Sequence, residues 1–218
     1  MRRSITSKVM KAAQEENEGA VAKLLPRRLI VGITGASGAI VGVRVLELLA
    51  KSTIETHLVM SRAAEMALAY ETDLQPKDVK ALASVHHAIM ALGAAISSGS
   101  FETMGMLIAP CSIRTMSEIA TGVTSTLLSR AADVVLKERR RLVLAIRETP
   151  LHLGHLRTMT ALAEMGAVVA PMAPAFYTRP NSVDDIVNHT AGRLLDLFGI
   201  STDAVRRWEG GSPKRPGG

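Results

Sequence analysis

The 218-residue sequence is poor in cysteine and in long apolar runs, and each shortage excludes a class of protein. Its single cysteine, Cys111, cannot form an intramolecular disulfide, which favours a reducing compartment. No Cys/His cluster has the spacing of a zinc site. No apolar run approaches the roughly 20 residues that a membrane-spanning helix needs, and the start of the chain lacks the apolar core of a secretory signal. We therefore expect a cytoplasmic protein with no metal site, disulfide framework or membrane span.

Aromatic residues are also scarce, at 3% of the chain, which is too few for a platform on which bases stack. The formal net charge of +6 suggests nucleic-acid binding, but its location argues against that function. Residues 1–28 carry a net +4 and residues 205–218 a net +3, whereas residues 29–204 carry a net −1. The basic stripe expected on a folded nucleic-acid-binding domain is therefore missing, and we expect no nucleic-acid partner.

Hydrophobic residues, at 47%, are abundant enough for a sizeable core in a single domain. Residues 1–26 are predicted to be an N-terminal extension, helical or disordered, that ends at Pro26. Residues 27–208 form the predicted domain. Residues 209–218 are rich in glycine and proline and are predicted to be a disordered tail.

Short apolar runs alternate with amphipathic stretches along the body of the chain. This alternation predicts an α/β fold, a three-layer Rossmann-like (flavodoxin-like) open parallel sheet with helices on both faces. The predicted strands are 29–34, 55–61, 104–110, 141–146 and 167–171. The predicted helices are 39–51, 62–71, one from Ser112, one from about Leu151 and one from about Val183 to Phe198, while 74–100 is a mixed stretch.

Each predicted strand ends in small hydroxyl residues, glycines or a charged pair. Ligands of such sheets bind beyond the carboxyl ends of the strands, so we expect these ends to form one site. They are residues 34–38, Ser61, residues 110–115, residues 147–150 and residues 174–177.

The first of these ends has glycines at 32, 35 and 38, a spacing that favours close approach of a phosphate to a helix N-terminus. A dinucleotide site would place an acidic residue after the second strand to hold a ribose. This chain has Met60 and Ser61 there, so a mononucleotide fits better than NAD. Ser112 could contribute to such a site or only cap its own helix.

Arg147 and Glu148 directly follow an apolar strand, where we expect both to be partly desolvated. They could form a structural ion pair, or an arginine that holds phosphate beside a carboxylate for acid–base work. We expect the run 139–141 to be solvated and Cys111 to be a small buried residue.

The motifs GITGASGAIVGVRVLELL, YETD, SSGSF, MLIAPCSIRT, RAADVVLKERRRLVLAIRETPLHLGHL and PAFYTRP occur in this order. From about Arg28 to Trp208 the chain resembles the UbiX-type flavin prenyltransferases. The resemblance implies transfer of a dimethylallyl group from dimethylallyl monophosphate to N5 and C6 of reduced FMN. It also implies a homo-oligomer, a dodecamer, and a UbiD-type decarboxylase as recipient of the prenylated FMN.

The resemblance also implies site residues, some of which a neighbouring subunit supplies in that family. The implied FMN contacts are Gly35, Ala36, Ser37, Ser61, Ser112, Ile113, Arg114, Thr115 and Arg147. The implied catalytic residues are Ser37, Glu71, Lys137 and Glu148. The implied contacts to the prenyl phosphate are Ser98, Gly99, Ser100, Arg130, Lys137, Tyr177, Arg193 and Trp208.

The chemistry of these residue types agrees with that role. Ionisation of a prenyl monophosphate needs concentrated positive charge, which arginine and lysine supply, and the sequence has no Asp-rich magnesium motif. Some relatives carry aromatic residues before the Ser-Gly-Ser loop, whereas residues 76–97 here contain none.

Two other functions remain open at this stage. A flavin-dependent decarboxylase of the cysteine-decarboxylating type relies on a histidine soon after the first helix, and the nearest one here, His57, lies within a predicted strand. A non-catalytic flavin carrier would not need Lys137 and Glu148 together.

Overall fold

Six parallel strands form one sheet in the computed structural model, which describes residues 27–205, 207 and 210. They are β1 (Arg28–Ile33), β2 (Glu55–Met60), β3 (Val85–His87), β4 (Gly105–Cys111), β5 (Arg141–Ile146) and β6 (Val168–Val169). Their order is β3-β2-β1-β4-β5-β6, and every neighbouring pair is parallel. The predicted open parallel sheet is confirmed.

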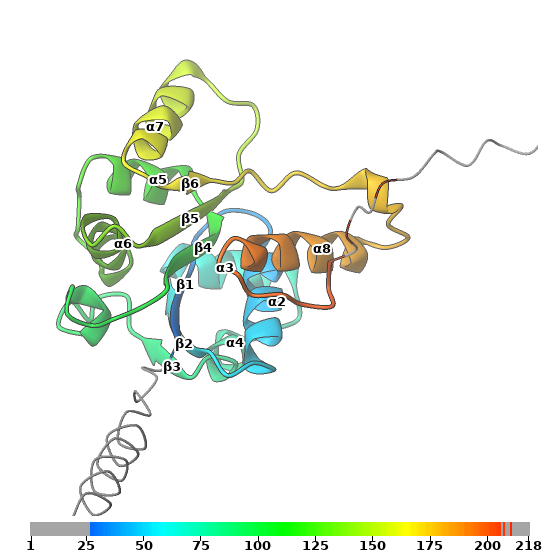
Figure 1. The fold of residues 1–218 in the computed structure, drawn as a ribbon, viewed down its shortest axis with the longest axis horizontal. Helices are drawn as coiled ribbons and strands as arrows, with labels where there is room; N and C mark the ends of the chain where they lie inside the picture. Colours follow the sequence, from blue (N-terminus) through cyan, green and yellow to red (C-terminus); the bar gives the residue numbers. More distant parts are fainter. Residues whose placement is uncertain (1–26, 206, 208–209, 211–218) are drawn as a thin grey trace, which may run out of the picture.

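Helices cover both faces of this sheet and give three layers (Figure 1). One face packs against α2 (Ala39–Ala50), α3 (Arg62–Glu71), α4 (Pro76–Ala81) and α8 (Val183–Asp196). The other packs against α5 (Ile113–Ala120), α6 (Leu127–Lys137), α7 (Leu153–Glu164) and the short helix η1 (Ala95–Ser97). A further short helix, η2 (Phe176–Thr178), precedes α8. Because both faces are covered, the central strands are nearly continuous apolar runs.

The structure corrects several predicted elements. The stretch 74–100, predicted only as mixed, contains α4, β3 and η1. The single helix predicted from Ser112 is two helices, because Gly122 has a φ of +69° and Thr126 begins a new helix as its N-cap. The strand predicted over 167–171 is regular only at Val168–Val169, although the N–H groups of Ala170 and Met172 still donate to the Leu144 and Ile146 carbonyls of β5. The segments 1–26 and 211–218 lie outside the described residues, so their predicted states stay predictions.

The site is positioned by the reversal of strand order at β1, which lies between β2 and β4. Such a reversal opens a crevice at the carboxyl edge of a sheet. Buried Thr34 ties the two strand ends together, since its hydroxyl donates to the Pro110 carbonyl at 2.8 Å and accepts from the Ser112 N–H at 2.8 Å. Across the described part of the chain, none of the helices has the length and apolar character to cross a membrane.

Candidate functional site

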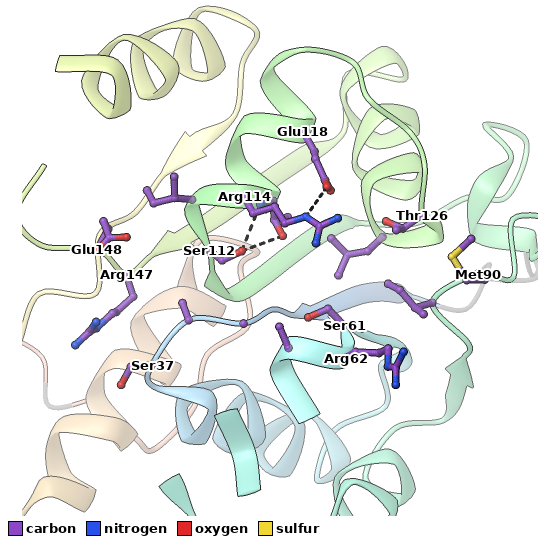
Figure 2. A pocket seen from close by; sticks show the side chains of 17 residues that line it. Ser37, Ser61, Arg62, Met90, Ser112, Arg114, Glu118, Thr126, Arg147 and Glu148 are labelled. Atoms are coloured by element: carbon purple, nitrogen blue, oxygen red, sulfur yellow. Dashed lines mark hydrogen bonds and ion pairs between the residues drawn. The ribbon is translucent and has the colours of Figure 1, made fainter. Parts of the chain in front are cut away.

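A cavity of about 740 Å³ opens at the carboxyl edge of β1, β2, β4 and β5 (Figure 2). All nine residues expected to contact FMN line it, and so does Glu148. The lining residues are Gly35, Ala36, Ser37, Ser61, Arg62, Ala63, Ile89, Met90, Ser112, Ile113, Arg114, Thr115, Glu118, Thr126, Leu128, Arg147 and Glu148. Four strand ends, not the predicted five, therefore form the site. The fifth end, residues 174–177, lies beyond β6 in a segment that runs away from the sheet (Figure 1).

The glycine loop after β1 is shaped by steric contact and by helix capping. A Cβ on Gly35 would lie 2.3 Å from the Ala63 Cβ, so only glycine fits against the start of α3. Gly38 has a φ of +96° and is the N-cap residue of α2. Glu71 Oε2 accepts hydrogen bonds from the N–H groups of Gly38 and Ala39 at 2.9 and 3.1 Å. In this structure the Glu71 carboxylate therefore takes the N–H groups at which a phosphate was predicted, and the phosphate position stays a prediction.

Three other helices begin at the cavity, and a hydroxyl caps each of them. Ser61 accepts from the Ala64 N–H at 3.1 Å in α3, and Ser112 accepts from the Thr115 N–H at 3.3 Å in α5. Thr126 accepts from the Ser129 N–H at 3.2 Å in α6. Both interpretations of Ser112 hold, since it caps its helix and lines the cavity. Three positive helix ends facing one cavity favour an anionic ligand.

Charged side chains surround these helix ends. Arg114 donates to Glu118 at 2.9 Å, and its side chain is 83% exposed. Arg147 and Glu148 are both exposed, so the prediction that they are partly desolvated is wrong for this chain. Glu148 Oε1 accepts from the Thr149 N–H at 2.9 Å. Figure 2 shows the Arg147 guanidinium pointing away from the Glu148 carboxylate, so both groups are available to a ligand.

One wall of the cavity is aliphatic. It is formed by Ile89 and Met90 from the segment after β3, by Ile113 and by Leu128. An apolar surface next to polar helix ends suits a ligand that combines a flat ring with a charged tail.

The described residues that were expected to bind the prenyl phosphate do not line the cavity of their own chain. Each of the cations has a carboxylate partner: Arg130 with Asp133 at 2.9 Å, Lys137 with Glu138 at 2.6 Å, and Arg193 with Asp196 at 2.6 Å. The Tyr177 hydroxyl lies 3.3 Å from His189 Nε2. Glu71 holds the α2 N-terminus, as described above, and Trp208 lies outside the described residues.

Ser98, Gly99 and Ser100 lie at the opposite end of α6 from Thr126. Arg140 donates to the carbonyl oxygens of Phe101 at 2.7 Å and Gly99 at 2.5 Å. Arg141 donates to the Leu197 carbonyl oxygen. The prediction of a solvated run at 139–141 holds for the exposed Arg139 and Arg141 and is wrong for the half-buried Arg140, which fastens the loop 98–101 to the sheet.

Cys111 is completely buried, and this burial raises the pKa of its thiol. The prediction of a small buried residue is confirmed. Among the residues that the structure describes, no three His, Cys, Asp or Glu side chains are grouped so that they could hold a metal ion.

The sequence analysis did not predict seven of the lining residues: Arg62, Ala63, Ile89, Met90, Glu118, Thr126 and Leu128. Three had a usable signal. Arg62 follows Ser61 directly, Glu118 lies four residues after Arg114 on one helix face, and Thr126 precedes an apolar helical run. Ile89 and Met90 lie in a segment without periodicity, so no local signal marked them.

Comparison with known proteins identifies close relatives of this chain. The family described as Flavoprotein matches residues 20–195. Flavin prenyltransferase UbiX of Escherichia coli K12 is 60% identical over 187 residues, which cover 84% of this chain and 99% of the relative. A crystal structure of AnUbiX (PadA1) in complex with FMN and dimethylallyl pyrophosphate is 48% identical, has a TM-score of 0.84, and matches over 86% of this chain and 100% of the other.

A crystal structure of a dodecameric FMN-dependent UbiX-like decarboxylase from Escherichia coli O157:H7 is similar to the same extent. It is 49% identical, has a TM-score of 0.82, and matches over 84% of this chain and 100% of the other. Both structures share the fold described here over nearly their whole length.

Proposed function

Because the chain belongs to the UbiX family of flavin prenyltransferases, we propose that its cavity binds FMN and that reduced FMN receives a dimethylallyl group there. The donor in this proposal is dimethylallyl monophosphate. The observation that carries it is the meeting of three helix N-termini with Arg147 at the crevice between β1 and β4.

The residues present fit FMN. A volume of about 740 Å³ lies within the usual range for a cofactor cavity. The aliphatic wall of Ile89, Met90 and Leu128 suits the flat ring, and the helix ends capped by Ser61 and Ser112 suit hydroxyl and phosphate oxygens. FMN supplies the nucleophilic ring atoms N5 and C6, and the protein supplies position and charge.

The roles of the charged residues follow from the balance of the reaction. The bond between the phosphate oxygen and the first prenyl carbon breaks, and its electron pair leaves with the phosphate. The first prenyl carbon bonds to N5, which loses its proton. The prenyl double bond then takes up a proton as its far carbon bonds to C6, which loses its own proton, so one proton is released in total. Cations stabilise the departing phosphate, and Glu148, exposed at the cavity, accepts or delivers the proton. Ser37 lines the same cavity, and in this proposal it orients the reacting groups.

Neighbouring copies of the chain complete the site in this proposal. Arg130, Lys137, Tyr177 and Arg193 do not line the cavity of their own chain, although their residue types suit a phosphate. A homo-oligomer, a dodecamer as in the UbiX-like relative, would bring them to the cavity of another copy. We assign Ser98, Gly99, Ser100 and Trp208 to the same shared site, and Glu71 to support of the glycine loop.

The product of this reaction, prenylated FMN, is itself a cofactor, so we expect another enzyme to use it. We propose a UbiD-type decarboxylase as the recipient. A cytoplasmic location suits the single buried thiol, which a reducing compartment keeps free. The cysteine-decarboxylase alternative finds no support, since His57 lies inside β2, outside the cavity.

The direct test is anaerobic incubation of the protein with reduced FMN and dimethylallyl monophosphate, followed by mass measurement of the released flavin. The proposal predicts a flavin that is heavier by one five-carbon unit, with no added metal ion. A flavin that binds and stays unmodified would support a carrier instead.

A further inference from the structure

His57 is a buried polar residue near the middle of β2, and it belongs to a row of polar groups. It is only 4% exposed, in β2. Its Nε2 lies 2.9 Å from Glu55 Oε1, and its Nδ1 lies 3.0 Å from His87 Nε2 in β3. Glu55 also accepts a hydrogen bond from Arg28 of β1 at 3.1 Å. A row Arg28–Glu55–His57–His87 therefore crosses three neighbouring strands.

The ring of Phe101 covers this row on one side of the sheet. The edge of the His57 ring lies against it with centroids 5.2 Å apart, and the Arg28 guanidinium carbon lies 4.6 Å from its centroid. Phe101 directly follows the Ser98–Ser100 loop, and Arg140 holds the carbonyl of Phe101. The row is thus fastened to the loop 98–101 as well as to the strands.

The other end of the row leads to the flavin cavity. His87 is the last residue of β3, and the chain continues directly to Ile89 and Met90, which form part of the aliphatic wall. The Ile89 carbonyl accepts from the Leu127 N–H at 2.8 Å, in the first turn of α6 beside Thr126. The position of this wall therefore depends on where His87 holds the end of β3.

We propose that His57 and His87 are positioning residues that hold the Ile89–Met90 wall against the cavity through the hydrogen bond between their rings, and that acid, by breaking this bond, releases the wall. This inference rests on the proposed function only for the identity of the ligand that the wall contacts.

The proton positions follow from the partners. Because His57 Nε2 donates to the Glu55 carboxylate, its Nδ1 accepts from His87 Nε2–H when both rings are neutral. One added proton, on His87 Nδ1, keeps the bond, with Nε2–H of His87 still the donor. A second places two N–H groups and two positive charges face to face across 3.0 Å, so the bond is lost.

The surrounding charges favour the neutral state of His87. Burial lowers its pKa, and the neighbouring His57 and His86 lower it further. Burial raises the pKa of Glu55, but hydrogen bonds from His57 and Arg28 outweigh this and hold it below the usual value. Burial lowers the pKa of His86, Lys80 lowers it further, and Glu65, which pairs with Lys80 at 2.7 Å, raises it. In the unfolded chain His87 binds a proton with its ordinary pKa of 6.5. Neutral His87 therefore stabilises the fold above pH 6.5, and this stabilisation is lost as the pH falls below that value.

The test uses the full chain without flavin and measures amide hydrogen exchange of residues 88–101 at about pH 8 and about pH 5, corrected for intrinsic exchange. We expect protection of 88–91 to fall about tenfold or more at the lower pH. In His87→Gln the side-chain amide of glutamine can donate to or accept from His57 Nδ1 and does not titrate. We therefore expect the backbone protection of 88–91 to stay high at both pH values. His86→Gln is the matched control on the same strand, and it keeps the acid response.

A wild-type chain whose 88–91 protection does not change with pH would overturn the proposal, as would a His87→Gln chain that loses protection like the wild type. FMN affinity measured on the same three chains adds a second readout: it falls in acid for the wild type and His86→Gln more than for His87→Gln. If none of the chains binds FMN, the proposed function fails, while the exchange data still decide the role of the pair.

Discussion

The carboxylate of Glu71 lies 2.9 Å from the backbone nitrogen of Gly38, so a side chain at the end of α3 caps the start of α2. This contact closes the position where many Rossmann-like proteins bind phosphate. It also links the glycine loop, which lines the cavity, to a second helix. In the proposed site we expect the flavin phosphate at the ends of α3, α5 and α6.

Glu71→Ala removes this cap and leaves the N–H groups of Gly38 and Ala39 without their acceptor. We expect a loss of about 0.5–2 kcal/mol in the free energy of unfolding, as for other helix caps, together with weaker FMN binding. Glu71→Gln keeps one acceptor oxygen and should lose less of both. Thermal unfolding measures the loss of stability, and flavin titration measures the loss of affinity. A Glu71→Ala variant as stable as the wild type would show that Glu71 does not stabilise the start of α2.

Gly35→Ala places a methyl group 2.3 Å from the Ala63 Cβ. We expect the loop to move, with a destabilisation of about 1–3 kcal/mol, as for overpacked sites, and FMN affinity to fall. Ala63→Gly removes the opposing methyl group, so the double variant Gly35→Ala/Ala63→Gly should recover most of the affinity. If the double variant binds FMN no better than Gly35→Ala, the contact with Ala63 is not the reason for the glycine.

Glu148→Gln keeps the shape and the hydrogen bond to Thr149 but removes the ability to carry a proton. Because Glu148 is exposed at the cavity, we expect nearly normal FMN affinity and stability. Prenyl transfer in a single turnover should slow by roughly 100-fold or more, the scale of general acid–base catalysis. Glu118→Gln, at the same cavity and paired with Arg114, is the matched control. An unchanged rate for Glu148→Gln would take this residue out of the mechanism.

The sequence predicts the parts of this fold that local patterns control. β1 and β4 are apolar and followed by helical periodicity, so their ends, which hold seven of the nine expected cavity residues, could be identified. The other two, Ser61 and Arg147, directly follow β2 and β5. β3 could not be identified, because three residues with two histidines resemble no strand pattern, and its pairing with β2 is a tertiary contact. For the same reason the wall at Ile89 and Met90 was missed.

The positions of charged side chains were harder to predict than the strands. Arg140 and Arg141 form part of a run that is typical of a solvated surface, yet each binds backbone carbonyls from distant segments. Arg147 and Glu148 follow a buried strand, yet the chain leaves the sheet at once and exposes them. Periodicity reports which face of an element is buried, and it carries no information on which distant loop or neighbouring copy a side chain meets.

The central claim is that the cavity of one copy works with the cations of another, and mixing two inactive variants tests it most directly. Lys137→Met keeps the cavity intact, whereas Arg147→Met damages the cavity and keeps Lys137. We expect each variant alone to form almost no prenylated flavin, and hybrid oligomers of the two to regain activity well above the sum of the separate variants. Lys137→Met mixed with Arg130→Met should regain none, since both changes lie on α6. A Lys137→Met and Arg147→Met hybrid that stays as inactive as its separate components would contradict the account.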